Sequence, residues 1–136
     1  MTNMFAAIVL GHLAGDYLLQ NRAMMLSKSK PGQKGRLICT LHCLFYTLAV
    51  CVFLKKTDIR TAAVVFASHW FIDRWSLAAK WMALIKSRQP GVTYRHKEID
   101  AAFYAIVYTA CDNAMHLILM WIGLNYTTKR GEKNER

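Results

Sequence analysis

Pairs of histidine and aspartate, spaced four residues apart, occur three times in this sequence within otherwise apolar stretches. Residues four apart lie on one face of an α-helix, one turn above each other, so both side chains of a pair can reach one cation. Imidazole nitrogens and carboxylate oxygens are ligands of zinc and of other divalent metals. The pattern therefore predicts metal binding by helices. The pairs are His12 with Asp16, His69 with Asp73, and Asp112 with His116.

A further histidine, His42, lies in another apolar stretch. Ionisable side chains inside lipid cost a few kcal/mol each, so a chain that keeps several of them there has a use for them. A catalytic zinc ion takes about three protein ligands, so this set suits two or more ions. We expect zinc, with manganese or iron as alternatives. The predicted ligands are His12, Asp16, His42, His69, Asp73, Asp112 and His116.

Four apolar blocks carry these residues, and each is close to the length of a membrane-spanning helix, about 20 residues. None shows the alternation of a β-barrel strand. We predict an all-α polytopic membrane protein with four transmembrane helices in one bundle. Residues 1–126 would form this single domain, and residues 127–136 a charged, disordered tail. The blocks are residues 4–19, 37–54, 61–85 and 99–124.

The four predicted helices alternate in direction, which sets the depth of each ligand. His12 and Asp16 lie late in the first helix, and His42 lies early in the second. Asp73 and Asp112 lie midway along the third and fourth helices. Side chains on facing helices of a bundle can build one internal metal site. We therefore expect the ligands to meet in one cavity.

The net charge of +10 is concentrated in the loops. Loops 22–36 and 86–98 carry nine lysines and arginines, against seven in loop 55–60 and the tail together. By the positive-inside rule, the first two loops are cytoplasmic and both termini lie outside. The first block has no positive residue before it and contains two ionisable residues, so we expect it to stay in the mature protein.

Two metal ions close together can activate water and stabilise an in-line displacement at phosphorus. Arg74 and Lys80 lie near the predicted ligands and could pair with a phosphate. Lys80 could instead extend to the membrane surface, and Arg74 could neutralise Asp73 or Asp112. The basic loops would attract anionic headgroups. We predict a metal-dependent hydrolase acting on a phosphorylated or lipid-like substrate at the bilayer.

Two alternatives stay open. The same residues could form a pathway for protons or divalent cations. They could also form hydrogen bonds between the helices of a non-enzymatic membrane interaction protein, bacterial or phage-encoded. Nucleic acid is not an expected partner, and the sequence leaves the oligomeric state open.

A family resemblance rests on residues 12–20, H-L-A-G-D-Y-L-L-Q. This segment resembles the H-x-x-x-D-[FY]-x-L-Q opening of a bacterial and phage family of small membrane proteins, called domain of unknown function 3307. The resemblance extends from Leu10 to about Leu119. It implies a four-helix protein of the bacterial inner membrane, but no reaction. Its further marks are matched by His42, by His69 with Asp73, and by Asp112 with His116.

More distantly, the pattern resembles the membrane-bound metal-dependent hydrolases of the YdjM type. Those proteins are grouped with zinc phospholipase C, whose helical fold holds a cluster of zinc ions. The resemblance implies hydrolysis by analogy of fold. This sequence departs from that pattern, because it lacks the H-x-x-x-H and H-x-x-x-E spacings.

Overall fold

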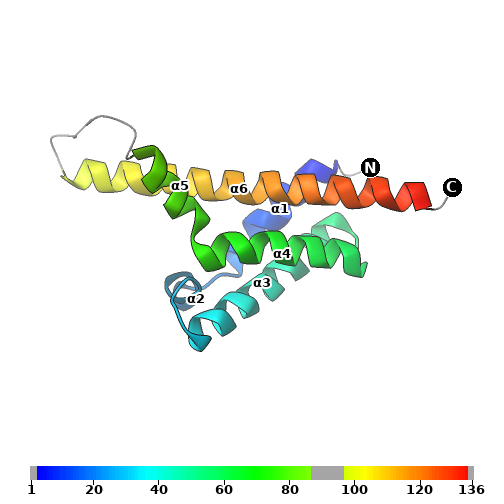
Figure 1. Cartoon of the computed structure of the whole chain (residues 1–136), viewed down its shortest axis with the longest axis horizontal. Coiled ribbons are helices and arrows are strands. Elements are labelled where there is room, and N and C mark those ends of the chain that lie inside the picture. Colours follow the sequence, from blue (N-terminus) through cyan, green and yellow to red (C-terminus); the bar gives the residue numbers. More distant parts are fainter. Residues whose placement is uncertain (1–2, 87–96, 135–136) are drawn as a thin grey trace.

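Helices form nearly all of the described part of the chain, residues 3–86 and 97–134, in this computed structural model (Figure 1). No strand occurs in these residues, which confirms the all-α prediction. The elements are α1 (Met4–Leu13), the π-helical turn η1 (Ala14–Leu18), α2 (Arg22–Ser27), α3 (Gln33–Leu54), α4 (Ile59–Trp75), α5 (Leu77–Lys86) and α6 (Lys97–Asn134).

Short polar side chains begin three of the helices. Asn3 accepts from the backbone N–H of the second residue of α1, and Asn21 accepts from an N–H in the first turn of α2. Asp58 caps α4, because Oδ1 accepts from Thr61 N at 2.9 Å and Oδ2 from Thr61 Oγ1 at 2.7 Å. These contacts satisfy N–H groups that the first turn of a helix leaves without a partner. Between Leu54 and Ile59 the connection is short, as predicted.

The third apolar block is broken at Ser76. Its φ of 48° and ψ of 51° lie in the left-handed region, and its N–H bonds back to the carbonyls of Asp73 and Ile72. A residue in this conformation ends a helix. The prediction of one continuous helix over residues 61–85 is therefore wrong, and Lys80 does not continue the polar face of α4. Figure 1 shows α5 leaving the end of α4 and running up to α6.

A π-helical turn interrupts the first block after Leu13. Within it the N–H of Leu19 bonds to the carbonyl of Ala14, five residues earlier, at 3.0 Å. Such turns are rare in proteins, and many of those that occur lie at functional sites. Here the turn carries Asp16.

The centre of the packing is α3, which contacts α1 and η1 on one side and α4 on the other, while α4 packs on α6. Gly15 allows η1 to approach α3 closely, because a Cβ there would lie 2.4 Å from Cδ2 of Tyr46. The buried apolar cluster draws on four helices and consists of Ile8, Tyr46, Val50, Val65, Met120 and Leu124.

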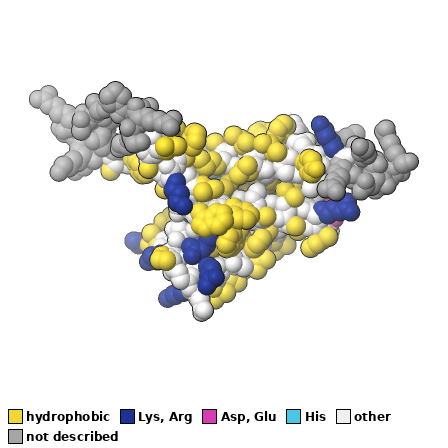
Figure 2. Space-filling view, viewed as in Figure 1, with side chains coloured by type: hydrophobic (Ala, Val, Ile, Leu, Met, Phe, Trp, Pro, Cys, Tyr) yellow, Lys and Arg dark blue, Asp and Glu magenta, His cyan; other side chains and the backbone are white. Residues whose placement is uncertain are grey.

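Two helices of the described residues are long and apolar enough to cross a bilayer, Gln33–Leu54 and Ala101–Lys129. The 22 residues of α3 would span about 33 Å, close to the thickness of a hydrocarbon core. Residues 4–18 and α4 are shorter, so two candidate spans are established and four remain a proposal. Figure 2 shows apolar side chains over much of the visible face, with lysines and arginines towards its ends.

The fourth block continues as helix beyond its predicted end. No proline interrupts it, and α6 extends to Asn134, through most of the segment expected to be a disordered tail. Thr127 and Thr128 both bond to the carbonyl of Leu124 in this part of the helix.

Candidate metal centre

Four atoms that could bind a metal ion lie close together, and their side chains come from η1, α3 and α4. Nε2 of His42 lies 3.0 Å from Nε2 of His69. Asp16 Oδ1 lies 3.1 Å from the first of these nitrogens and 3.3 Å from the second. Asp73 Oδ2 lies 3.3 Å from the His42 nitrogen and 3.1 Å from the His69 nitrogen. We call these residues (Asp16, His42, His69 and Asp73) the four-ligand set.

Five of the six atom pairs within the four-ligand set have the spacing of a tetrahedral metal site. Zinc bonds nitrogen and oxygen at about 2.0–2.1 Å, so the edges of its tetrahedron measure about 3.3 Å. The five distances given above run from 3.0 to 3.3 Å. Two imidazole nitrogens facing each other at this distance share at most one proton. A cation bound to the two nitrogens and to a carboxylate oxygen would replace these contacts, so the residues fit a divalent metal.

Beside this set lies a second group that shares Asp73. His116 Nε2 is 3.7 Å from Asp73 Oδ1 and has no hydrogen-bond partner, although the side chain is 1% exposed. Its other nitrogen, Nδ1, donates to the carbonyl of Asp112 at 2.8 Å. The lone pair on Nε2 is therefore directed towards Asp73, as in a metal-binding histidine. Asp112 Oδ2 lies 3.8 Å from Nδ1 of His116, and Asp73, Asp112 and His116 form a potential three-ligand group.

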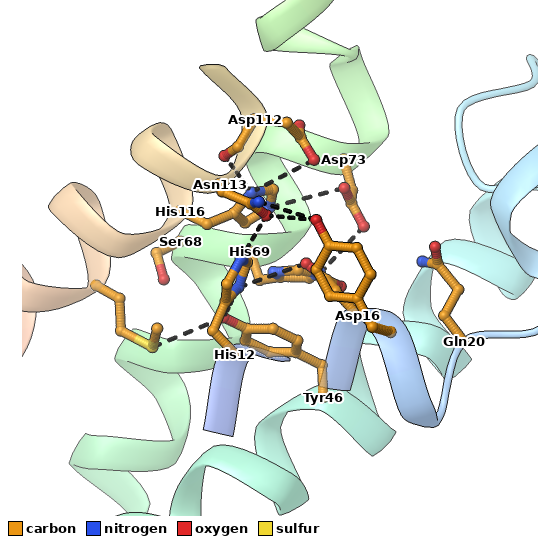
Figure 3. Close-up of polar contacts among 12 residues, drawn as sticks. His12, Asp16, Gln20, Tyr46, Ser68, His69, Asp73, Asp112, Asn113 and His116 are labelled. Carbon is orange, nitrogen blue, oxygen red and sulfur yellow. Dashed lines mark hydrogen bonds and ion pairs between the residues drawn. The ribbon is translucent and has the colours of Figure 1, made fainter. Parts of the chain in front are cut away.

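His12 plays a different part from the other predicted ligands. Its Nε2 lies 2.9 Å from Asn113 Oδ1, and its Nδ1 lies 2.9 Å from the hydroxyl of Tyr46. An amide oxygen can only accept, so Nε2 carries the proton and Nδ1 accepts from Tyr46. Both nitrogens are thus in use, and Nδ1 is 3.4 Å from Asp16 Oδ2. This arrangement positions Asp16 and its helix (Figure 3).

Arg74 and Lys80 were predicted as anion-binding residues, and within the described residues no hydrogen bond or ion pair joins either side chain to a predicted ligand. Arg74 donates from Nη1 to the carbonyls of Ser29 and Lys30, at 3.1 Å each. It therefore ties the end of α4 to the turn that follows α2. Lys80 lies on α5 with an exposed side chain.

Sequence reasoning missed Lys28, whose Nζ lies 2.7 Å from Asp73 Oδ2. Burial opposes the charged form of this lysine, but the nearby carboxylates of Asp73 and Asp16 prevail and raise its pKa above the ordinary value. The loop that carries it contains five lysines and arginines, and nothing in their spacing singles out the one that turns inwards. Tyr46 was missed as well, and its ring stacks on His69 with centroids 3.6 Å apart.

A cavity of about 180 Å³ opens beside the two groups. Three carboxylates, those of Asp16, Asp73 and Asp112, line one part of it. Figure 3 shows Asp16, Asp73 and Asp112 arranged around the central histidines. The remaining wall is formed by Tyr17, Gln20, Met25, Lys28, Ser29, Ile72, Ser76, Tyr108, Thr109 and Asn113.

Comparison with known protein families assigns this chain to a family. The profile of the family described as "Protein of unknown function (DUF3307)" matches residues 4–134. The chain belongs to the DUF3307 family. No curated protein and no solved structure matches it.

The DUF3307 match runs from the start of α1 to the end of α6, so every residue of the four-ligand set lies inside it. The fold and the centre are thus parts of one family domain. The predicted likeness to YdjM-type hydrolases finds no support in these comparisons.

Proposed function

We propose that this DUF3307 protein is a membrane-embedded, metal-dependent hydrolase that acts on a phosphorylated or lipid-like substrate. The observation that carries the proposal is the spacing within the four-ligand set, in which five atom pairs lie 3.0 to 3.3 Å apart. Zinc is the cation that this spacing and these ligands suit best. We also propose that all four apolar blocks lie in the bilayer of the bacterial inner membrane, with both termini outside the cytoplasm.

The two groups of ligands suit two different tasks. A zinc ion with four protein ligands is closed, whereas a catalytic zinc ion has three and keeps one position for water or substrate. The four-ligand set suits the first kind, and Asp73, Asp112 and His116 suit the second. Of these three, Asp73 and Asp112 line the cavity, from which water and a substrate would enter. A cation there would act as a Lewis acid and make bound water a nucleophile at neutral pH.

The shared carboxylate of Asp73 would keep the two positions close together. Its Oδ2 belongs to the four-ligand set and its Oδ1 faces His116. A cation in the closed four-ligand set would add positive charge beside the open position, where negative charge develops during a displacement at phosphorus. This pairing of positions suits the hydrolysis of a phosphoester.

The test is to measure metal content and turnover on the same preparations. Detergent-purified protein is analysed for metal, reconstituted with phosphatidic acid, and assayed for phosphate release before and after removal of metal with a chelator. We expect about two ions per chain, and turnover that is lost with the metal and restored by zinc. Folded protein without metal, whose stability does not change with added cations, would contradict the proposal.

A relay for protons or divalent cations is the second candidate, and one observation favours it. The predicted ligands form a continuous series, in which neighbouring side chains approach to between 3.1 and 3.8 Å. Such a series is how acids and histidines pass protons through transporters. Ion flux in proteoliposomes that disappears in Asp112→Asn, without any hydrolysis, would favour the relay. The series runs from Asp112 through His116, Asp73, His69 and Asp16 to His12.

A further inference from the structure

One lysine brings a positive charge to the metal centre from outside the apolar helices. Lys28 follows α2, and its Nζ lies 2.7 Å from Asp73 Oδ2. The side chain is 14% exposed, so the ammonium group is largely enclosed yet lines the cavity. A lysine placed in this way does not resemble the exposed loop lysines, which serve as topology signals.

The turn that carries Lys28 is held in place from two sides. Arg74 donates to the carbonyls of Ser29 and Lys30. On the other side, Gly35 lies against the same turn, because a Cβ at this position would be 1.9 Å from the Lys30 carbonyl oxygen. The inward direction of Lys28 is therefore built into the contacts of α3 and α4 with this turn.

Lys28 and a bound cation would share one carboxylate oxygen. Asp73 Oδ2 is the partner of Lys28 and also a member of the four-ligand set. A cation bound there would take up much of the negative charge of Asp73, and the two positive groups would then repel each other at close range. An anion beside both of them relieves that repulsion. The cavity next to Lys28 is the space where such an anion fits.

The cavity has room and hydrogen-bonding groups for a phosphate. A water molecule takes up about 30 Å³ of liquid, so 180 Å³ accommodates a phosphate group with several waters. Tyr17 and Asn113, which bond to each other, lie on its wall with Tyr108. Hydroxyl, amide and ammonium groups can donate to phosphate oxygens, and the contact with the ammonium is the strongest of these.

We infer that this cavity binds the phosphate group of the substrate, and that Lys28 is the residue that holds it once a cation occupies the neighbouring ligands. The inference rests on the proposed metal-dependent function and names its substrate-binding residue. Cation and phosphate then bind cooperatively, each strengthening the affinity of the protein for the other.

The experiment measures the binding of inorganic phosphate to zinc-loaded and metal-free protein in detergent by calorimetry. Lys28→Met is compared with Lys30→Met, a control that removes the same charge from the same turn at an exposed side chain. Zinc content and thermal unfolding are measured for each protein. We expect Lys28→Met to keep its zinc and to bind phosphate about ten- to a hundredfold more weakly, the loss for a charge-assisted hydrogen bond. Lys30→Met should bind phosphate as the unaltered protein does.

Nanodiscs of phosphatidylcholine, with and without phosphatidic acid, distinguish the two sources of the phosphate. Competition between phosphatidic acid and inorganic phosphate assigns the cavity to a lipid headgroup, and the lack of competition assigns it to a soluble phosphate. Zinc-loaded Lys28→Met with unchanged phosphate affinity would overturn this inference and leave the metal centre standing. Folded protein that binds no zinc would overturn both.

Discussion

Asp73 is the residue on which both proposed metal positions depend, so its carboxylate offers the sharpest test. Oδ2 belongs to the four-ligand set, Oδ1 faces His116, and the side chain is 2% exposed. Asp73→Asn keeps the shape of the side chain and removes its charge. Loss of a residue that only supports a ligand already costs about 10–100-fold in metal affinity. We therefore expect this variant to lose at least about a hundredfold.

The magnitude follows from binding linkage. A ligand present at a hundred times its dissociation constant stabilises the folded state by about 2.7 kcal/mol, and one present at its dissociation constant by about 0.4 kcal/mol. At a zinc concentration of the first kind, Asp73→Asn should therefore lose about 2.3 kcal/mol of zinc-dependent stabilisation. The assay is thermal unfolding in detergent across a zinc titration, with metal content measured on the same samples.

Asp58→Asn is the matched control. It makes the same chemical change at the start of the same helix, and asparagine keeps the helix cap. Its zinc content and zinc-dependent stability should equal those of the unaltered protein. If Asp73→Asn also keeps the metal content and the full shift in unfolding temperature, Asp73 is not a ligand and the bridged arrangement is refuted.

Three further predictions concern packing, the α2–α3 turn and pH. Gly15→Ala should destabilise the protein by about 1–3 kcal/mol, since its Cβ would meet the Tyr46 ring; an unchanged midpoint of denaturant unfolding would argue against the close approach of η1 and α3. Arg74→Gln should free the turn that carries Lys28, and we expect faster proteolysis there, whereas an unchanged rate would show that the turn is held by other contacts. Hydrogen bonds from Thr61 lower the pKa of Asp58, so its capping contribution is complete above the ordinary pKa of an aspartate and is lost as the pH falls through the lowered value. Asp58→Ala should therefore cost about 0.5–2 kcal/mol at neutral pH, and unfolding midpoints that fail to converge with those of the unaltered protein in acid would contradict this assignment.

Residue types and helical spacing were sufficient to predict that the chain is all-helical and to select the ligand-type side chains. Two residues four apart on a helix meet because local geometry places them together, and His69 and Asp73 do approach to 3.1 Å. The prediction of convergence followed from depth within the bundle. It required no knowledge of how the helices pack.

The sequence did not predict the two places where a helix is interrupted. The left-handed residue that ends α4 is Ser76. Glycine or asparagine is the usual sequence signal for a helix end, so the sequence did not predict this one. The π-turn that carries Asp16 has no signature in the sequence either. In both places tertiary packing overrides the local preference for a continuous α-helix.

The sequence by itself determined which chemistry is available, because histidines and aspartates four residues apart share a helix face and are ligands for divalent metals. Only the tertiary structure decided which of these side chains lie close together and which are engaged in other contacts. It brought Asp16 and Asp73 each to within 3.3 Å of both His42 and His69, and it engaged both nitrogens of His12 elsewhere. It also turned Lys28 inwards. Distances between helices depend on side-chain packing, such as that of Gly15 against Tyr46, and the spacing along the chain carries no record of them.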